Sequence, residues 1–296
     1  MRRFIGAAIY LLSGAIGVLA FIYPFFMPTA TTTQQGMAHS QDAPLVTAAL
    51  VGLSVVALLV ELQGRSLSAK TVAMLGVLVA VTSALRFLEI VVPMPGGFSP
   101  IFAPIIITGY VFGGRFGFLM GAFTLLASAL VTGGVGPWLP YQMFTAGWTG
   151  LTAGWLPHPT FHSSGFTFHG PRNRESKTQS GIRLNILILC IFGFIWGLLY
   201  GAIINVYFWP FAGGPAAQTW APGIGLGEML ARYGAFYAVT SLGWDLARGV
   251  GNVALILVLG APMIKTLERF RRRFSFDVAH AGDGTGAITS EAETYA

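Results

Sequence analysis

Two acid/base pairs, each spaced by one helical turn, lie in stretches that are otherwise apolar enough to span a bilayer. Arg86 precedes Glu89 by three residues, and Asp245 precedes Arg248 by three residues. Side chains at this spacing share one face of a helix, so each pair can form an ion pair or line a common cavity. Ionised groups in a membrane are energetically costly and usually face a polar cavity. These four residues are therefore the first candidates for a ligand site.

Uncharged polar residues and aromatic residues are expected near the same end of the predicted helices. Asn252 follows Asp245 by two turns, Gln142 and Asn205 lie in other apolar segments, and several aromatic side chains are close in depth: Trp138, Tyr141, Trp148, Trp209 and Trp244. A few fixed polar groups beside aromatic walls are typical of a small-molecule pocket. The predicted substrate-binding residues are Arg86, Glu89, Trp138, Gln142, Asn205, Asp245, Arg248 and Asn252. Alternatively, the charges form structural bridges between helices and the aromatic residues form an interfacial belt.

One apolar segment also carries a stripe of small residues on a single helical face: Ala69, Ala73, Gly76, Ala80 and Ala84. Small residues at this spacing let two helices approach closely. At about 100° per residue, Arg86 and Glu89 point away from the stripe. One face of this helix is expected to meet another helix, either of the same chain or of a partner, and the other face a cavity.

The composition indicates an integral membrane protein. Of the 296 residues, 54% are hydrophobic and 9% are charged, and the mean hydropathy is +0.68, which lies outside the usual range of soluble proteins. Eight apolar runs predict an all-α fold of about eight transmembrane helices, since lipid requires internally satisfied backbones. They cover residues 4–27, 44–62, 70–92, 100–113, 115–132, 138–156, 184–208 and 241–264.

The eight runs suggest three regions. Residues 1–66 hold two additional N-terminal helices, 67–274 a six-helix core, and 275–296 a disordered tail. Runs 100–113 and 115–132 are short, and Gly113-Gly114 permits a tight turn between them, so they predict a helical hairpin. Residues 157–182 are expected to be a polar loop, and 228–239 a short helix that acts as a lid over a pocket or as an interfacial anchor.

Basic residues predict the orientation. They cluster on one side of the predicted spans, whereas 28–43, 93–99 and 133–137 contain neither lysine nor arginine. Cytoplasmic loops are enriched in these residues, so both termini are expected in the cytoplasm, in a multi-pass protein of the plasma membrane. All four charges of the two acid/base pairs then belong to the outer leaflet.

Sequence motifs for catalysis or nucleotide binding are absent. The chain has no G-x-x-x-x-G-K-[ST] run and no H-E-x-x-H. Its single cysteine, Cys190, permits no intrachain disulfide. His158, His162 and His169 are spaced as ordinary loop histidines, so no catalytic residue, metal site or cofactor is predicted.

Three motifs resemble the substrate-binding S component of energy-coupling factor (ECF) vitamin transporters. The first is the small-residue stripe at 69–84. The second combines Phe98-Ser-Pro-Ile-Phe-Ala-Pro with the glycine-rich run at 109–121, and the third is Trp244-Asp-Leu-Ala-Arg-Gly-Val-Gly-Asn-Val-Ala before a basic patch. This resemblance covers residues 68–273 and implies a six-helix core. The two N-terminal helices are additional to that core, and they either pack beside it or take part in assembly.

The resemblance also implies partners and a mechanism. S components capture a vitamin outside the cell and associate with a transmembrane coupling protein that carries two cytosolic ATPases. The stripe Ala69, Ala73, Gly76, Ala80 and Ala84 would contact the coupling protein, and the loop at 93–100 would close over the ligand. ATP hydrolysis by the partners would topple the S component and expose its ligand inward. This chain would then be a binding subunit and not an enzyme.

Two rival functions remain open at this stage. One is a self-sufficient secondary carrier with Glu89 or Asp245 as its proton-coupling carboxylate, and the other is a membrane-embedded lipid-modifying enzyme. The substrate is not specified by the sequence. The N terminus, Met-Arg-Arg-Phe-Ile, lacks the histidine of cobalt and nickel relatives, which argues against a bare metal ion. A polar heterocyclic vitamin, a nucleobase-like compound or a corrinoid suits the predicted pocket.

Overall fold

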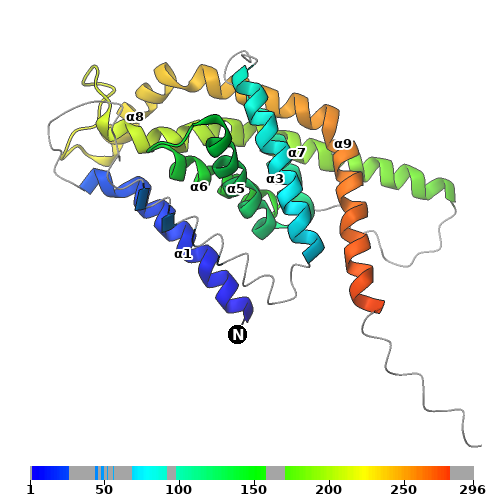
Figure 1. Ribbon diagram of the computed structural model, residues 1–296. Helices are drawn as coiled ribbons and strands as arrows, with labels where there is room; N and C mark the ends of the chain where they lie inside the picture. Colours follow the sequence, from blue (N-terminus) through cyan, green and yellow to red (C-terminus); the bar gives the residue numbers. More distant parts are fainter. Residues whose placement is uncertain are drawn as a thin grey trace, which may run out of the picture.

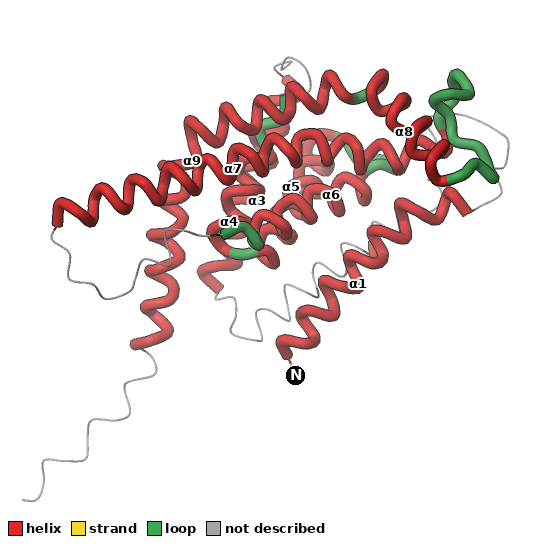
Figure 2. Tube along the Cα trace, turned by 180° about the vertical axis from the view of Figure 1, so that it is seen from behind, coloured by secondary structure: helices red, strands yellow, loops and turns green. Residues whose placement is uncertain are grey.

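The protein is all-helical in its described part. The computed structural model describes residues 2–26, 69–91, 98–157 and 171–280, with isolated positions between 44 and 56, and these residues contain helices, turns and no strand (Figure 2). The helices are α1 (Arg2–Ile22), α3 (Ala69–Val91), α4 (Phe102–Phe112), α5 (Gly114–Thr132), α6 (Leu139–Ala153), α7 (Pro171–Phe208), α8 (Leu226–Thr240) and α9 (Leu242–His280). The predicted all-α class is confirmed.

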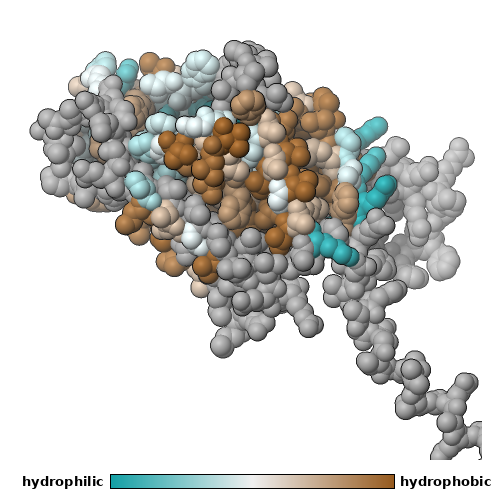
Figure 3. Space-filling view, viewed as in Figure 1, coloured by the Kyte–Doolittle hydropathy of each residue, from teal (hydrophilic) through white to brown (hydrophobic). Residues whose placement is uncertain are grey.

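Four of these helices are long and apolar enough to cross a membrane, namely those containing Lys70–Phe87, Gly114–Thr132, Gly181–Phe211 and Leu242–Arg271. Their exposed side chains are largely hydrophobic. Figure 3 shows a broad hydrophobic area on one face, with strongly hydrophilic side chains gathered towards one end. Exposed apolar surface of this extent suits contact with lipid tails, and the chain is a multi-pass membrane protein.

Helix α4 forms the centre of the bundle. It packs against α5, α6, α7 and α9, and each residue from Phe102 to Val111 is buried. A helix that is apolar on all sides is stable only when it is surrounded. Gly113 follows with φ 95°, a conformation that glycine adopts without steric strain, and α5 then begins at Gly114. The predicted helical hairpin is confirmed.

Two pairs of helices pack closely through glycine. A Cβ atom on Gly117 of α5 would overlap the backbone of Gly150 on α6, and a Cβ atom on Gly197 of α7 would overlap Gly249 on α9. Glycine permits backbones to approach this closely in a membrane. The α5–α6 and α7–α9 pairs (Figure 1) therefore form tight units, and α4 packs against all four of these helices.

Helix α1 packs beside the core. The ring centroids of Phe21 and Tyr141 on α6 are 4.9 Å apart, in an edge-to-face arrangement. Phe25, in the 3-10 turn after α1, has its ring centroid 5.9 Å from that of Trp209. Such aromatic pairs add to the free energy of apolar burial. Of the two alternatives for the N-terminal segment, packing beside the core describes α1. The second predicted span, 44–62, lies largely outside the described residues.

Two boundaries differ from the sequence-based expectation. Helix α7 begins at Pro171, so residues 171–182 are helical, although their polarity suggested a loop. Proline is favoured in the first turn of a helix, and the arginines, glutamate and lysine that follow are good helix formers.

Helix α9 continues to His280 and contains Pro262, which accounts for its bend in Figure 1, because proline removes a backbone hydrogen bond. Residues 281–296 of the predicted tail and 158–170 of the predicted loop lie outside the described part.

Candidate functional site

The charged residues of α3 are held by neutral partners. Arg86 lies near the end of the helix and donates a hydrogen bond from Nη2 to Gln142 Oε1 on α6, at 3.3 Å. Glu89, one turn later, accepts a hydrogen bond from Ser99 Oγ at 2.7 Å. Both charged side chains are half-buried. Because amide and hydroxyl partners do not neutralise an ionic charge, Arg86 and Glu89 keep the capacity to bind a charged or polar group.

The charged residues of α9 form an ion pair. Arg248 Nη1 donates to Asp245 Oδ1 and also lies 3.4 Å from the carbonyl oxygen of Gly197 on α7. The Asp245 side chain is 2% exposed, whereas the Arg248 side chain is 16% exposed. The two predicted acid/base pairs thus have different environments, since Asp245 is enclosed by the helices and Arg248 extends beyond it.

The two pairs meet around one tyrosine. Glu89 is within electrostatic range of both Arg86 and Arg248, and Tyr200 on α7 is within range of all four charges. We refer to Arg86, Glu89, Asp245 and Arg248 as the charged cluster. Its members come from α3 and α9, which are far apart in sequence, and they lie within electrostatic range of one another at the end of the bundle predicted to face outward.

Two aromatic rings lie next to the charged cluster. Phe102, the first residue of α4, and Tyr200 have ring centroids 4.6 Å apart. The guanidinium carbon of Arg248 lies 5.2 Å from the centroid of Tyr200 and 6.0 Å from that of Phe102, within cation–π range. The sequence analysis did not single out Ser99, Phe102 or Tyr200. The first two lie in the motif at 98–104, which was the available signal for them.

The remaining predicted site residues have other neighbours. Asn252 is 1% exposed and donates from Nδ2 to Gly193 O at 2.9 Å, which ties α9 to α7. Asn205 donates to Ser241 Oγ at 2.5 Å. Trp138 is 41% exposed, and its indole nitrogen donates to Gly134 O at 3.2 Å. None of these three hydrogen bonds involves a residue of the charged cluster.

Helix α8 covers the side of α7 next to Asp245. Its Tyr233 and Tyr237 lie one turn apart and donate hydroxyl hydrogen bonds to the carbonyl oxygens of Ala202 and Leu198. Burial, followed by the nearby Asp245 carboxylate, raises the pKa of Tyr237 to about 12, so its hydroxyl remains a donor at neutral pH. The short helix expected at 228–239 is present, and it is anchored to α7 by these two tyrosines.

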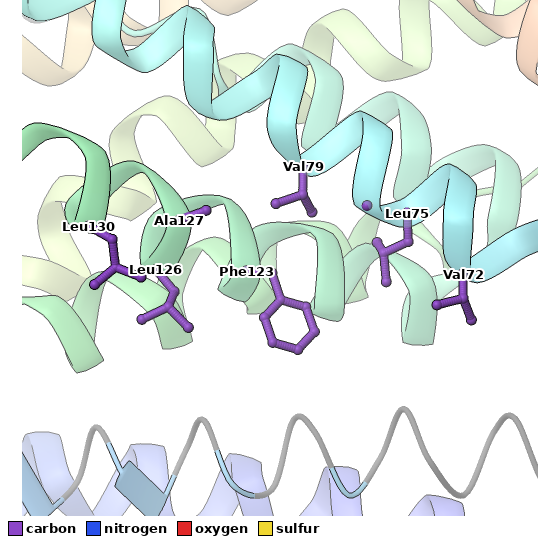
Figure 4. A pocket seen from close by; sticks show the side chains of 8 residues that line it. Val72, Leu75, Val79, Phe123, Leu126, Ala127 and Leu130 are labelled. Carbon is purple, nitrogen blue, oxygen red and sulfur yellow. The ribbon is translucent and has the colours of Figure 1, made fainter.

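The small-residue stripe is on the outside of the bundle. Ala73, Gly76, Ala80 and Ala84 are exposed, whereas the adjoining side of α3 packs on α5 through buried residues such as Leu75, Val79 and Ser83. Ala69 begins the helix, and its side chain is outside the described part. Between α3 and α5 runs an apolar groove of about 290 Å³, lined by Val72, Leu75, Gly76, Val79, Phe123, Leu126, Ala127 and Leu130 (Figure 4).

Among the residues that the structure describes, no three histidine, cysteine, aspartate or glutamate side chains lie together in a way that could hold a metal ion. His158, His162 and His169 lie outside that part of the chain. The chemistry that the described site offers is therefore that of binding, with guanidinium, carboxylate, amide and hydroxyl groups beside aromatic rings.

Comparison with known proteins agrees with this arrangement. The family model described as "ECF transporter, substrate-specific component" matches residues 70–260, which is more than half of the chain. No curated protein and no solved structure matches. The matched region begins with α3 and includes all four residues of the charged cluster.

Proposed function

The chain belongs to the family of ECF transporter substrate-specific components, and on this premise we propose that it captures a vitamin or related micronutrient outside the cell and delivers it inward together with partner proteins. The partners are a transmembrane coupling protein and two cytosolic ATPases, which supply the energy. The protein itself is a transporter component and carries out binding and translocation.

The observation that carries this proposal is the convergence of the charged cluster within a membrane bundle. Arg86 and Glu89 of α3 and Arg248 of α9 are all within electrostatic range of Tyr200, and Arg248 lies over the rings of Phe102 and Tyr200. Burying these groups is costly unless the site gains by binding a ligand. A planar polar molecule would lie beside these residues and exchange hydrogen bonds with the guanidinium, carboxylate and Gln142 amide groups. The site therefore suits a heterocyclic micronutrient.

The distribution of basic residues supports the direction of transport. Helices α5 and α7 have arginines at their second residues, and Lys265, Arg269 and Arg271 lie towards the end of α9. The positive-inside rule places these ends, and both termini, in the cytoplasm. The charged cluster then lies in the outer leaflet, where a substrate from outside reaches it.

The exposed stripe on α3 is the proposed docking surface for the coupling protein. Its small side chains lie on the lipid-facing side of α3, and a Cβ atom on Gly76 would meet no atom within 4 Å. The adjoining groove between α3 and α5 widens this apolar surface (Figure 4). A partner helix can approach such a surface closely without displacing long side chains.

Native mass spectrometry of the purified protein tests the substrate site. We expect a co-purifying small molecule, which identifies the substrate, and its loss from the Glu89→Ala variant. The Leu257→Ala variant is the matched control, because Leu257 is 61% exposed on α9. A bound molecule that persists unchanged in Glu89→Ala contradicts the proposed site.

A further inference from the structure

The Asp245 carboxylate occupies the space that Gly201 of α7 leaves by having no side chain. We call this space the seat. A Cβ atom on Gly201 would overlap both carboxylate oxygens, and Asp245 itself is 1% exposed. Any other L-amino acid at position 201 would carry such an atom, so glycine is what leaves room for the carboxylate. This arrangement encloses the charge between α7 and α9 and keeps it away from any ligand in the cluster.

Among the described residues, the enclosed carboxylate has Arg248 as its ionic partner. Its Oδ1 accepts a hydrogen bond from Arg248, and the Tyr237 hydroxyl also lies close to the carboxylate. The other groups around it are uncharged: the Tyr237 hydroxyl and the main chain at Gly201. A buried charge that loses its partner is strongly destabilised, so Asp245 holds the Arg248 guanidinium firmly.

Arg248 links the enclosed Asp245 carboxylate to the aromatic residues of the proposed binding site. Its guanidinium interacts with Asp245 on one side, is near Gly197 O, and lies over the rings of Tyr200 and Phe102. A guanidinium has five N–H donors in a planar fork. Both contacts use Nη1, which leaves the donors on Nη2 and Nε for other groups, and Glu89 is within electrostatic range of Arg248. The orientation of the fork decides which donors reach a ligand.

We infer that Asp245 is a positioning residue: from its seat at Gly201 it holds Arg248 over Tyr200 and Phe102, and Arg248 is the residue of this pair that contacts the substrate. The inference rests on the proposed function for the substrate contact. The positioning itself is a property of the unliganded protein, and it can be measured without knowing the substrate.

The reactivity of Arg248 towards phenylglyoxal tests the positioning in the full-length, detergent-solubilised protein. Phenylglyoxal reacts with the deprotonated guanidinium, which pairing with a carboxylate disfavours. Peptide mass spectrometry gives the rate at each arginine. In Asp245→Asn, which keeps the shape of the side chain, we expect Arg248 to react roughly tenfold faster, in line with the strength of a charge-assisted hydrogen bond. Gly201→Ala should have the same effect because it displaces the carboxylate.

Two controls separate this effect from a general loosening of the fold. Gly243→Ala is the matched glycine variant, since Gly243 lies on α9 two residues before Asp245 and a Cβ atom there meets nothing within 4 Å. It should leave the Arg248 rate unchanged. Arg271 serves as an internal reference in every sample, because it donates to Val111 O at 2.7 Å, far from the cluster in sequence. Its rate should stay constant.

A double-mutant cycle tests whether Gly201 acts through Asp245. In the Asp245→Ala background there is no carboxylate to displace, so adding Gly201→Ala should change the Arg248 rate little. An unchanged Arg248 rate in Asp245→Asn, or an equal rise at Arg271, overturns the inference. If Arg248 responds as expected but Arg248→Ala still retains the co-purifying molecule, the positioning stands and the substrate contact of Arg248 is refuted. Loss of the molecule from Arg248→Ala supports both.

Discussion

Neutral hydrogen-bond partners distinguish Glu89 and Arg86 from the buried ion pair at Asp245. Ser99 orients the Glu89 carboxylate, and Gln142 orients the Arg86 guanidinium, so each charged group is held by a hydrogen bond to a neutral partner. Inside a membrane such oriented charges are useful only if another polar group completes them. This pattern explains why the substrate is proposed to meet α3 and Arg248, while Asp245 supports them from behind.

Removing the Glu89 carboxylate should weaken substrate binding. We expect Glu89→Ala to lower the affinity for the co-purified substrate by about tenfold or more, since a hydrogen bond to a charged group contributes about 1.5–3 kcal/mol. Isothermal titration with the identified molecule measures the change. Glu228→Ala is the matched control, because Glu228 is an exposed carboxylate paired with Arg232 on α8. An equal loss in both variants would contradict a specific role for Glu89.

At the residue scale, the sequence pointed to the charges and to Gln142, but not to Ser99 or Tyr200. Arg86, Glu89, Asp245 and Arg248 stand out because charge is rare in apolar segments. Ser99 and Tyr200 do not, since a serine in a loop and a tyrosine in an apolar helix are common. Their importance depends on which helices become neighbours, and tertiary packing decides that.

At the scale of helices, α3 has one face proposed for docking and another that carries charged residues of the proposed substrate site. Its stripe of small residues is exposed, while Arg86 and Glu89 reach partners on α6 and in the segment before α4. A large side chain on the stripe should therefore affect docking without reaching the substrate site. We expect Ala80→Trp to bind the substrate normally and to abolish uptake in cells that contain the partners.

The control for Ala80→Trp is a tryptophan on another lipid-facing surface. Leu187 on α7 is 55% exposed, and Leu187→Trp should retain uptake. Binding is measured by titration of the purified variants, and uptake by accumulation of the labelled substrate in cells. Normal uptake by Ala80→Trp would refute the docking surface on α3.

Glycine contacts between helices should govern stability. A Cβ atom on Gly117 would overlap the backbone of Gly150, which cannot move without shifting α6. Gly117→Ala should therefore lower the Tm of the purified protein by several degrees, since overpacking typically costs about 1–3 kcal/mol. Gly76→Ala, where a Cβ atom meets nothing within 4 Å, should leave the Tm unchanged or slightly raised. Equal Tm values for the two variants would contradict the described α5–α6 packing.

Helix positions were largely predictable, because runs of apolar residues in a membrane protein have few alternatives to helices. The short hairpin was also predictable, from Gly113-Gly114. The polar start of α7 was not, since hydropathy detects only the part of a helix that lies in lipid. The glycines of α7 at 193, 197 and 201 also form a stripe of small residues on one helical face, as on α3. Spacing alone does not tell whether such a stripe meets a helix of the same chain or a partner.

At the scale of the whole molecule, the account requires the charged cluster to face outward. The single cysteine, Cys190, allows this to be tested after Cys190→Ser. A cysteine introduced as Gln218→Cys, in the segment before α8, should react with a membrane-impermeant maleimide on intact cells. Lys265→Cys, near the opposite end of α9, should react only after the membrane is permeabilised. The reverse pattern would place the cluster on the cytoplasmic side and refute the proposed direction of capture.

The architecture combines a family core with an N-terminal extension. The family match starts at residue 70, whereas α1 precedes it and packs on α6 through Phe21 and Tyr141. The stripe on α3 stays exposed with α1 in place. The extension therefore leaves the proposed docking surface accessible, and the division of the chain at residue 66 remains a prediction.

Dependence on the partner proteins tests the central claim most directly. Uptake of the co-purified molecule is measured in cells that produce this chain alone, in cells that also produce a coupling protein with its two ATPases, and in cells whose ATPases lack a functional nucleotide site. The account predicts binding in all three and uptake only with the complete, active set. Uptake by the chain alone would contradict the account and favour a self-sufficient carrier that uses an intramembrane carboxylate.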